Sequence, residues 1–238
     1  MGEPTKVIYW NTLYRADPAE QLEAIETIED DFDPDYLCLS EVTSAQDRTG
    51  LRELLVSRGY DVKYQPTTRL NANVSEGIAI VSNAELPKVS WEILSRGRGI
   101  RGVKTRRLGY FSVQRSGSEP ITIATTHKSY PFIINRALIE AEDEKLLEVL
   151  PDSRTVVGGD FNTTFGRATL ERLEDSDWMA IRDPIRTKTF VNKIGKLSLD
   201  LLALDHVYAT SDIADQVSTV ILSMNHPSNH HPILSFIR

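Results

Sequence analysis

The chain has 238 residues, of which 40% are hydrophobic and 26% are charged, as in a globular protein with a sizeable core. Its formal net charge of −7 excludes general basicity as a means of attracting a polyanion, so any attraction to phosphate must be local. The single cysteine, Cys38, excludes an internal disulfide and fits a reducing compartment. From this length we expect one domain that spans residues 1–238.

Neither a targeting segment nor a membrane span is predicted. Residues 6–10 already have the pattern of a strand, and no basic and apolar leader precedes them. No apolar run approaches the ~20 residues that a membrane-spanning helix needs. These patterns predict a cytoplasmic protein.

The first half of the chain is predicted to alternate strands with helices. Residues 7–10 form a short apolar strand that ends at Asn11. Asp17 as N-cap and Pro18 at the first helical position then open a helix, whose apolar residues recur at helical spacing as far as Phe32. There follow a strand at 36–40, a helix at about 46–57, a strand at 60–65, a polar loop at 67–75, and strands at 77–81 and 88–94.

The second half continues the alternation. Strands are predicted at 108–114 and 121–126, separated by a turn at 116–118, and then a helix at 131–150, a strand at 155–157 and a helix around 167–173. Short strands follow near Trp178, Thr189, Val207, Val220 and Leu234. Because short turns and helices both connect the strands, the sheets should be mixed, and the fold class is α/β or α+β.

One stretch carries most of the chemical information: Val156-Val157-Gly158-Gly159-Asp160-Phe161-Asn162. The two glycines are expected to end the strand and allow a tight turn. In an extended segment Asp160 and Asn162 point to the same side, where a carboxylate and a carboxamide together can hold a hard cation or an oxyanion. Taken alone, these residues are explained more simply by an Asx turn, in which both side chains cap their own backbone.

Similar polar residues follow several other apolar runs, namely Trp10-Asn11, Leu39-Ser40-Glu41, Thr125-Thr126-His127, Leu204-Asp205-His206 and Ser228-Asn229-His230-His231-Pro232. In this order and spacing, from Trp10 to Pro232, the set resembles the endonuclease/exonuclease/phosphatase superfamily of metal-dependent phosphoesterases. Gly-Asp-Phe-Asn is its most specific piece. The resemblance implies a four-layer α/β/β/α sandwich of two mixed sheets flanked by helices.

The resemblance also implies a metal site. Glu41 corresponds to the principal Mg²⁺ ligand with Asn11 beside it, and Mn²⁺ is an alternative ion. Where the family has Ser-Asp-His, this chain has Ser228-Asn229-His230, which puts Asn229 at the metal pocket. A neutral amide there replaces an acid, so metal affinity and activity are expected to be weakened.

The remaining implied roles are catalytic. His230 corresponds to the family's histidine and Asp205 to its paired acid, so the pair accepts a proton from water or stabilises the transition state. His127 contacts the phosphate or protonates the leaving group. Asp160 positions the nucleophilic water, and Asn162 binds a phosphate oxygen. The competing interpretation treats His230 and His231 as surface loop residues and Asp205 as a turn acid after Leu204.

Two further assignments are left open by the sequence. Glu76 is a candidate to orient His127, and is equally well explained as a solvated loop acid. His226 and His230 have a spacing that suits zinc, but zinc prefers three or four nitrogen or sulfur ligands, and the only thiol lies within a strand.

Residues 96–107 contain six arginines or lysines and no acid, in a chain that is acidic overall. With three glycines, the stretch is predicted to be a flexible loop or a frayed strand pair. Arg98, Arg101 and Lys104 are candidate contacts to a phosphate backbone, and Tyr130 is a candidate to stack on a base. A solvated basic hairpin explains the same pattern.

We therefore predict a Mg²⁺-dependent phosphoesterase that acts as a nuclease on DNA or RNA. One alternative is a phosphatase or phosphodiesterase for a small or lipid phosphate. Another is a nucleic-acid binder in which Asn229 has weakened catalysis. The basic stretch favours a polyanionic partner, and the retained acids and histidines argue against an inactive enzyme.

Overall fold

The computed structural model describes residues 2–46, 49–99, 102–114, 117–129, 136–163, 173, 175–183, 188–194 and 197–238. The helices are α1 Pro18–Phe32, α2 Leu51–Ser57 and α3 Arg136–Val149, with a short 3₁₀ helix, η1, at Ala214–Gln216. The strands are β1 Thr5–Asn11, β2 Tyr36–Ala45, β3 Asp61–Arg69, β4 Val74–Ser82, β5 Ser90–Gly99, β6 Gly102–Val113, β7 Ile121–His127, β8 Thr155–Asp160, β9 Trp178–Ile181, β10 Phe190–Ile194, β11 Leu197–Leu202, β12 Asp205–Thr210, β13 Val217–Ile221 and β14 Ile233–Ile237. None of the described helices is long and apolar enough to cross a membrane.

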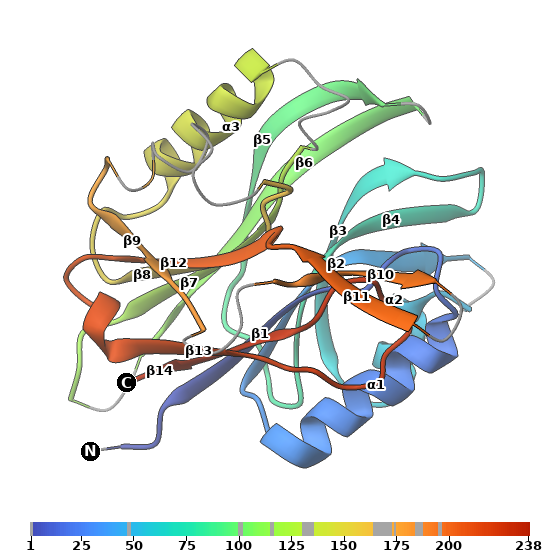
Figure 1. Ribbon diagram of the computed structural model, residues 1–238, viewed down its shortest axis with the longest axis horizontal. Helices are drawn as coiled ribbons and strands as arrows, with labels where there is room; N and C mark the ends of the chain where they lie inside the picture. Colours follow the sequence, from blue (N-terminus) through green and yellow to red (C-terminus); the bar gives the residue numbers. More distant parts are fainter. Residues whose placement is uncertain are drawn as a thin grey trace.

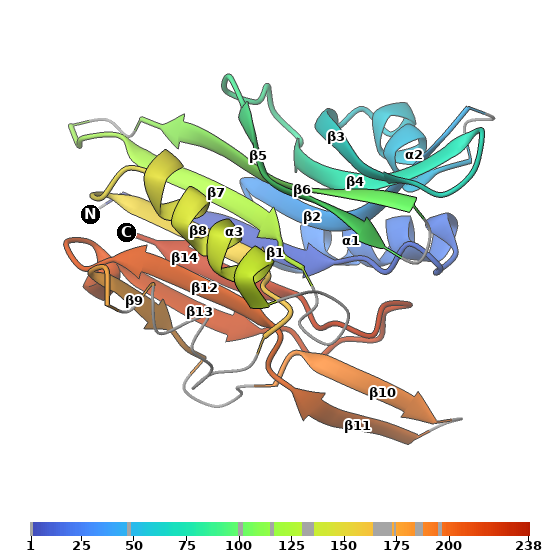
Figure 2. The ribbon, with the colours of Figure 1, turned by 90° about the horizontal axis from the view of Figure 1, so that it is seen from above.

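Twelve of these strands form one mixed sheet, in the order β13-β14-β1-β2-β4-β3-β6-β7-β8-β12-β9 with β5 paired to β6 (Figure 1). β1 and β2 are parallel, as are β7 and β8, and the other pairs are antiparallel. β10 and β11 form a separate hairpin that projects from the body of the protein (Figure 2). The mixed sheet confirms the predicted fold class.

The sheet folds back on itself into a barrel-like sandwich. Its two halves are joined through β3 and β6 at a single residue pair, Thr68 with Lys104. Away from that join, β1 of one half packs against β8 of the other, since a Cβ at Gly158 would lie 2.6 Å from the ring of Tyr9. The enclosed core draws buried side chains from both halves, among them Val7, Tyr9, Cys38, Ile80, Phe111, Ile123, Val156 and Val207.

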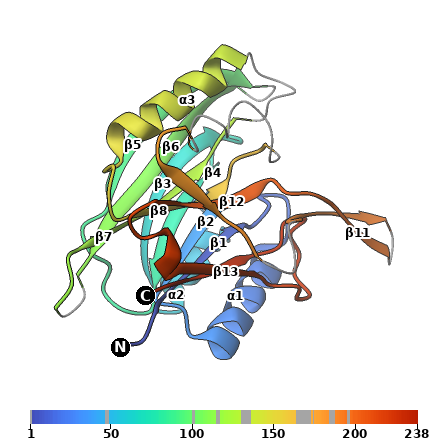
Figure 3. The same ribbon diagram turned by 60° about the vertical axis from the view of Figure 1, so that its left-hand side comes forward.

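Three helices among the described residues flank the sheet, α3 on one side and α1 and α2 on the other (Figure 3). α1 begins as predicted, because the Asp17 carboxylate accepts hydrogen bonds from the backbone of Ala19 and Glu20, and Pro18 follows it. α1 and α2 bury their apolar stripes against β1, β2 and β4. α3 packs Leu146 over β6, β7 and β8. The helices thus cover the outer faces and leave the strand ends free to carry polar residues.

Several predicted boundaries were wrong. The polar stretch 67–75 is not a loop, because β3 runs to Arg69 and β4 begins at Val74, and the two pair as a hairpin. α2 begins at Leu51 rather than near 46, and residues 47–48 lie outside the described residues. One strand was expected near Thr189, but β10 and β11 form a hairpin there. For the basic stretch, predicted as a loop or a strand pair, the structure shows the strand pair β5 and β6, and residues 100–101 lie outside the described part.

Two other helix predictions are only partly covered. α3 is described from Arg136, so the predicted start near 131 lies outside the described residues, and of the helix expected around 167–173 only Leu173 is described.

Gly158 and Gly159 do not end their strand, because β8 continues to Asp160. Gly158 instead makes room for the Tyr9 ring across the sandwich. Gly159 has a φ of 135°, and a Cβ there would lie 2.1 Å from the carbonyl oxygen of Thr126 on the neighbouring strand. The two glycines therefore permit close packing along β8, and the strand continues through them to Asp160.

Candidate active site

Polar side chains from both halves of the sheet meet where β1, β7 and β8 end, beside the irregular part of β2 around Glu41. In the first half Asn11 pairs with Ser40, and in the second half His127 pairs with Asp160. The Asn11 side-chain amide donates a hydrogen bond of 2.8 Å to Asp160 Oδ2, which links the two halves directly. The sequence predicted that these residues belong together, and the structure brings them into contact.

Glu41 lies within β2, not just past it as predicted, because the strand continues to Ala45. The pairing with β4 is irregular between Leu39 and Val42, and Glu41 has a φ of 58°. This distortion re-aims the side chain at a β-bulge, a device found beside active sites. Glu41 Oε2 accepts a hydrogen bond from the backbone of Tyr14 (3.1 Å). Burial and the nearby Glu76 carboxylate raise the pKa of Glu41.

His230 and Asp205 form the buried pair that the sequence predicted. Nδ1 of His230 lies 2.8 Å from Asp205 Oδ2. Burial lowers the pKa of His230, but the carboxylates of Asp205 and Asp160 outweigh it and raise that pKa to about 9. His230 is therefore protonated at neutral pH. The hydroxyl oxygen of Thr189 accepts the backbone N–H of Asp205 (3.0 Å) and so helps to fix the carboxylate.

Ser228 ties the His230 segment to β1. Its hydroxyl donates to the carbonyl oxygen of Asn11 (2.6 Å) and accepts the backbone N–H of His230 (3.0 Å). The indole N–H of Trp10 donates to the carbonyl oxygen of His230 (2.8 Å). The sequence placed Ser228 in a motif but gave it no role, and the structure shows it as a positioning residue.

Asp160 and Asn162 form the Asx turn that was the simpler explanation of their spacing. Asp160 Oδ1 accepts the backbone N–H of Asn162 (2.8 Å), as in an Asx turn. The φ of 53° at Asn162 departs from the extended geometry that was expected. Burial raises the pKa of Asp160 to about 7, against the opposing effect of the His230 charge. The Asn162 amide donates to the carbonyl oxygen of Lys128 (2.9 Å), beside His127.

His127 faces two carboxylates across short gaps. Its Nε2 lies 3.7 Å from Asp160 Oδ2 and 3.9 Å from Glu41 Oε1. Burial, together with the charges of Arg106 and Lys104, holds the pKa of His127 well below its usual range. His127 is therefore neutral at pH 7. The expectation that Glu76 orients His127 is not met, since the described charged partner of Glu76 is Lys104, whose Nζ lies 3.6 Å from Glu76 Oε1.

The sequence profile of the Endonuclease/Exonuclease/phosphatase family matches residues 8–230. The chain belongs to this family. As a family phosphoesterase it carries a buried Asp/Asp/His group that could hold a metal ion. A search among curated proteins by sequence alone finds no match.

Solved structures of other proteins share the family fold. An endonuclease/exonuclease/phosphatase family protein from Leptotrichia buccalis superimposes with a TM-score of 0.77 at 14% identity, over 98% of this chain and 99% of that chain. The human Nocturnin catalytic domain with bound sulfate gives 0.71 at 17%, over 99% and 93%. The 3′ phosphatase NExo from Neisseria, bound to a product DNA hairpin, gives 0.67 at 17%, over 98% and 99%. At these identities the likeness concerns the fold alone.

The residues present fit a divalent cation of the kind that the family implies. One ligand atom from each of Asp160, Asp205 and His230 lies within 4.8 Å of the others, the one such group of His, Cys, Asp and Glu in the described part of the chain. Oδ1 of Asp205 and Oδ1 of Asn229 are buried without a hydrogen-bond partner among the described residues. Buried oxygens left unpaired are costly, and a cation would satisfy them. Nε2 of His226 lies 3.1 Å from Nδ1 of His231. His226 therefore contacts His231 and not His230, with which its spacing had suggested a zinc site.

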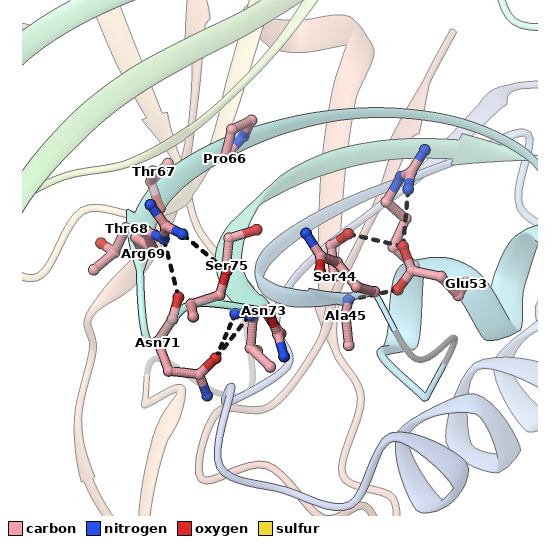
Figure 4. A pocket seen from close by; sticks show the side chains of 14 residues that line it. Ser44, Ala45, Glu53, Pro66, Thr67, Thr68, Arg69, Asn71, Asn73 and Ser75 are labelled. Atoms are coloured by element: carbon pink, nitrogen blue, oxygen red, sulfur yellow. Dashed lines mark hydrogen bonds and ion pairs between the residues drawn. The ribbon is translucent and has the colours of Figure 1, made fainter.

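The residues proposed for substrate binding are only partly described. Arg101 and Tyr130, and the side chain of Arg98, lie outside the described residues. Lys104 is described, on β6 beside Glu76. A polar pocket of about 580 Å³ lies between the end of β2, α2 and the β3–β4 hairpin (Figure 4). Its lining includes Ser44, three residues along β2 from Glu41, and Ser75, which precedes Glu76 on β4.

Sequence reasoning missed a second set of residues that support the site. Lys128, next to His127, forms a fully buried ion pair with Asp143 of α3. The backbone N–H and hydroxyl of Ser129 both donate to the Glu142 carboxylate on the same helix. No local pattern marks such residues, because charged side chains are usually solvated and their burial depends on where α3 packs.

Proposed function

We propose that the protein is a Mg²⁺-dependent nuclease that hydrolyses phosphodiester bonds of DNA or RNA, with Mn²⁺ able to substitute. The observation that carries the proposal is the convergence of Asn11, Asp160, Asp205 and His230 at one buried edge, with Glu41 and His127 alongside. The packing of helices on both outer faces of the folded sheet supports a four-layer sandwich as its architecture, in one domain over residues 1–238.

Glu41, Asn11 and Asn229 would hold the cation. Glu41 supplies a carboxylate at the bulge, 17% exposed, and Asn229 supplies the unpaired Oδ1. Asp160 and Asp205 are near enough to add negative charge. When bound, a divalent cation neutralises phosphate charge and activates water.

The protonation states suggest how the chain's own residues divide the work. Asp160, with a pKa near 7, is matched to take a proton from the attacking water at neutral pH. His230 already carries a proton, so we assign it to stabilising the charge of the transition state rather than to accepting the proton. Asp205 orients the imidazole and supports its charge through the 2.8 Å contact.

His127 and Asn162 are assigned to the phosphate oxygens. A neutral His127 is a poor acid, so its hydrogen-bonding capacity suits phosphate contact better than protonation of the leaving group. Asn162 uses one amide hydrogen for Lys128 and retains a second for a phosphate oxygen.

Nucleic acid is favoured as the substrate by the basic β5–β6 strand pair in an acidic chain. The DNA product named for the similar Neisseria structure agrees with this class. Arg98, Arg101 and Lys104 are proposed backbone contacts, and Tyr130 a stacking residue. Replacing the three basic residues with alanine should lower the salt slope of binding by about one unit for each phosphate that is no longer bound.

The test is Mg²⁺-dependent hydrolysis of a panel: plasmid, single-stranded DNA, RNA, bis-p-nitrophenyl phosphate and a phosphomonoester. We expect cleavage of a nucleic acid and of the small diester, with loss in EDTA and recovery with Mg²⁺ or Mn²⁺. Release from the monoester alone would favour the phosphatase alternative. Binding of nucleic acid without hydrolysis of any substrate would favour a binder weakened by Asn229.

A further inference from the structure

Arg106 is a buried cation for which the described residues offer no counterion. The residue is 4% exposed, and its Nε and Nη1 have no hydrogen-bond partner among the described residues. No described carboxylate lies within ion-pair distance of its guanidinium. A buried charge without a partner is strongly unfavourable, so such a group calls for an anion that the chain itself does not provide.

Arg106 stands at the junction of the two halves of the sheet, which we define as Thr68, Glu76, Lys104 and Arg106. Thr68 of β3 pairs with Lys104 of β6 on one side and with Glu76 of β4 on the other. Lys104 and Arg106 are two residues apart on one strand and therefore project from the same face. Oγ1 of Thr68 and Oε1 of Glu76 are also buried without a hydrogen-bond partner among the described residues. Unpaired polar atoms thus gather at one place.

The junction lies beside the catalytic residues. β6 pairs with β7 as far as Leu108 and Thr126, so Arg106 and Lys104 continue past the end of β7 where His127 stands. The charges of both residues act on the His127 imidazole. The polar pocket of Figure 4 reaches the junction at Thr68.

We propose that Arg106, assisted by Lys104 and Thr68, binds a second phosphate group of the substrate beside the phosphate that is hydrolysed. The proposal rests on the proposed function and narrows its substrate class to molecules with two phosphates. Arg106 can offer two N–H groups to two oxygens of one phosphate, a geometry that suits guanidinium. Lys104 is partly neutralised by Glu76 at 3.6 Å, so the junction has a net charge near +1, which matches one phosphodiester.

Two kinds of substrate supply this chemistry. A nucleic-acid backbone carries a neighbouring phosphate on each nucleotide, and a small bisphosphate carries its own. The basic strand pair favours the backbone. The dinucleotide pTpT, which has a 5′ phosphate, and TpT, which lacks it, test the first source, and fructose 1,6-bisphosphate and fructose 6-phosphate test the second.

The experiment compares kcat and KM for each pair in wild type, Arg106→Met and the matched control Arg107→Met. Arg107 is the adjacent, half-buried arginine, whose Nε donates to the carbonyl oxygen of Pro66 (3.0 Å). For one of the two pairs, we expect the KM of wild type to be about tenfold or more lower for the member with two phosphates. Arg106→Met should abolish that preference, measured as the ratio of the two KM values within each pair, so that a change in turnover through the His127 imidazole does not affect the comparison. Arg107→Met should keep the preference. The substrate pair that shows the preference identifies whether the second phosphate comes from a nucleic-acid backbone or from a small bisphosphate.

Stability supplies a second readout that separates binding from a structural role. Because Met removes an unpaired buried charge, Arg106→Met should unfold at the same temperature as wild type or above it, without ligand. Arg106→Lys, which keeps the charge but not the guanidinium fork, should show an intermediate preference.

A marked loss of stability in Arg106→Met, or failure to fold, would overturn the proposal, as would a preference that is absent in wild type or survives in the variant. Failure of the proposed function is recognised separately, because wild type would then fail to hydrolyse bis-p-nitrophenyl phosphate in Mg²⁺.

Discussion

The ammonium group of Lys128 and the carboxylate of Asp143 form an ion pair in which both side chains are 0% exposed. Lys128 directly follows His127, its backbone N–H donates to the carbonyl oxygen of Asp160 (2.9 Å), and its own carbonyl oxygen accepts the Asn162 amide (2.9 Å). α3 therefore fixes three site residues through one charged contact. Burying two charges is costly, so we infer that the ion pair positions the neighbouring site residues more than it stabilises the fold.

A double-mutant cycle tests this relationship. Lys128→Met and Asp143→Leu should each cost about 3–5 kcal/mol of unfolding free energy, because each leaves an unpaired buried charge. The double variant should recover most of that loss, as measured by urea unfolding. We expect its kcat on bis-p-nitrophenyl phosphate to be below that of wild type, since the segment after His127 keeps only the Ser129–Glu142 hydrogen bonds to α3. Full recovery of kcat would show that the pair does not position the site.

The pH dependence of stability tests the His230–Asp205 pair in metal-free protein. The folded state holds the His230 proton more tightly than the unfolded state, with a pKa of about 9 against 6.5. The stabilisation is therefore complete below pH 6.5 and is lost as the pH rises through about 9, by at most on the order of 3 kcal/mol. Urea unfolding in EDTA from pH 6 to pH 10 should show this decline. Asp205→Asn should flatten it, and an equally steep decline in that variant would contradict the assignment.

Asn229→Asp should tighten the binding of Mg²⁺. The buried, unpaired Oδ1 of Asn229 lies beside His230. A carboxylate at this position would add a negative charge, which attracts a dication more strongly than the dipole of an amide does. Two unit charges ~4 Å apart attract by about 4 kcal/mol at an effective dielectric near 20, before desolvation and repulsion from Glu41 and Asp160 reduce the gain. We expect a net gain of roughly tenfold in affinity, measured by calorimetry. An unchanged or weaker affinity would mean that Asn229 does not face the metal.

The strands that carry the site were the most predictable part of the fold. Apolar runs at residues 7–10 and 155–157 fixed β1 and β8, because a buried strand needs continuous apolar side chains. The polar residues after them marked the site edge. What the pattern could not show was the continuation of β2 through Glu41 and of β3 through Thr68, since polar residues there are buried by tertiary pairing.

The residues that support the site could not be predicted from the sequence either, because their burial also depends on tertiary packing. Arg106 stands among six basic residues, and only its burial separates it from the others. Thr189 and Asp143 reach the site from elements distant in the chain, so their contacts depend on how the sheet folds back and where α3 packs. The family resemblance supplied the candidate catalytic residues, but it indicated none of these three.

The most direct test of the central claim is the Mg²⁺-dependent turnover of bis-p-nitrophenyl phosphate by Asp160→Asn and His230→Ala, with folding confirmed by circular dichroism. Wild type should turn over this diester in Mg²⁺ and stop in EDTA. Each variant should lose at least ~100-fold in kcat, because we assign Asp160 to taking the proton from water and His230 to stabilising the transition-state charge. Turnover close to wild type in either folded variant, or full activity of wild type in EDTA, would contradict the assignment of this edge as the active site.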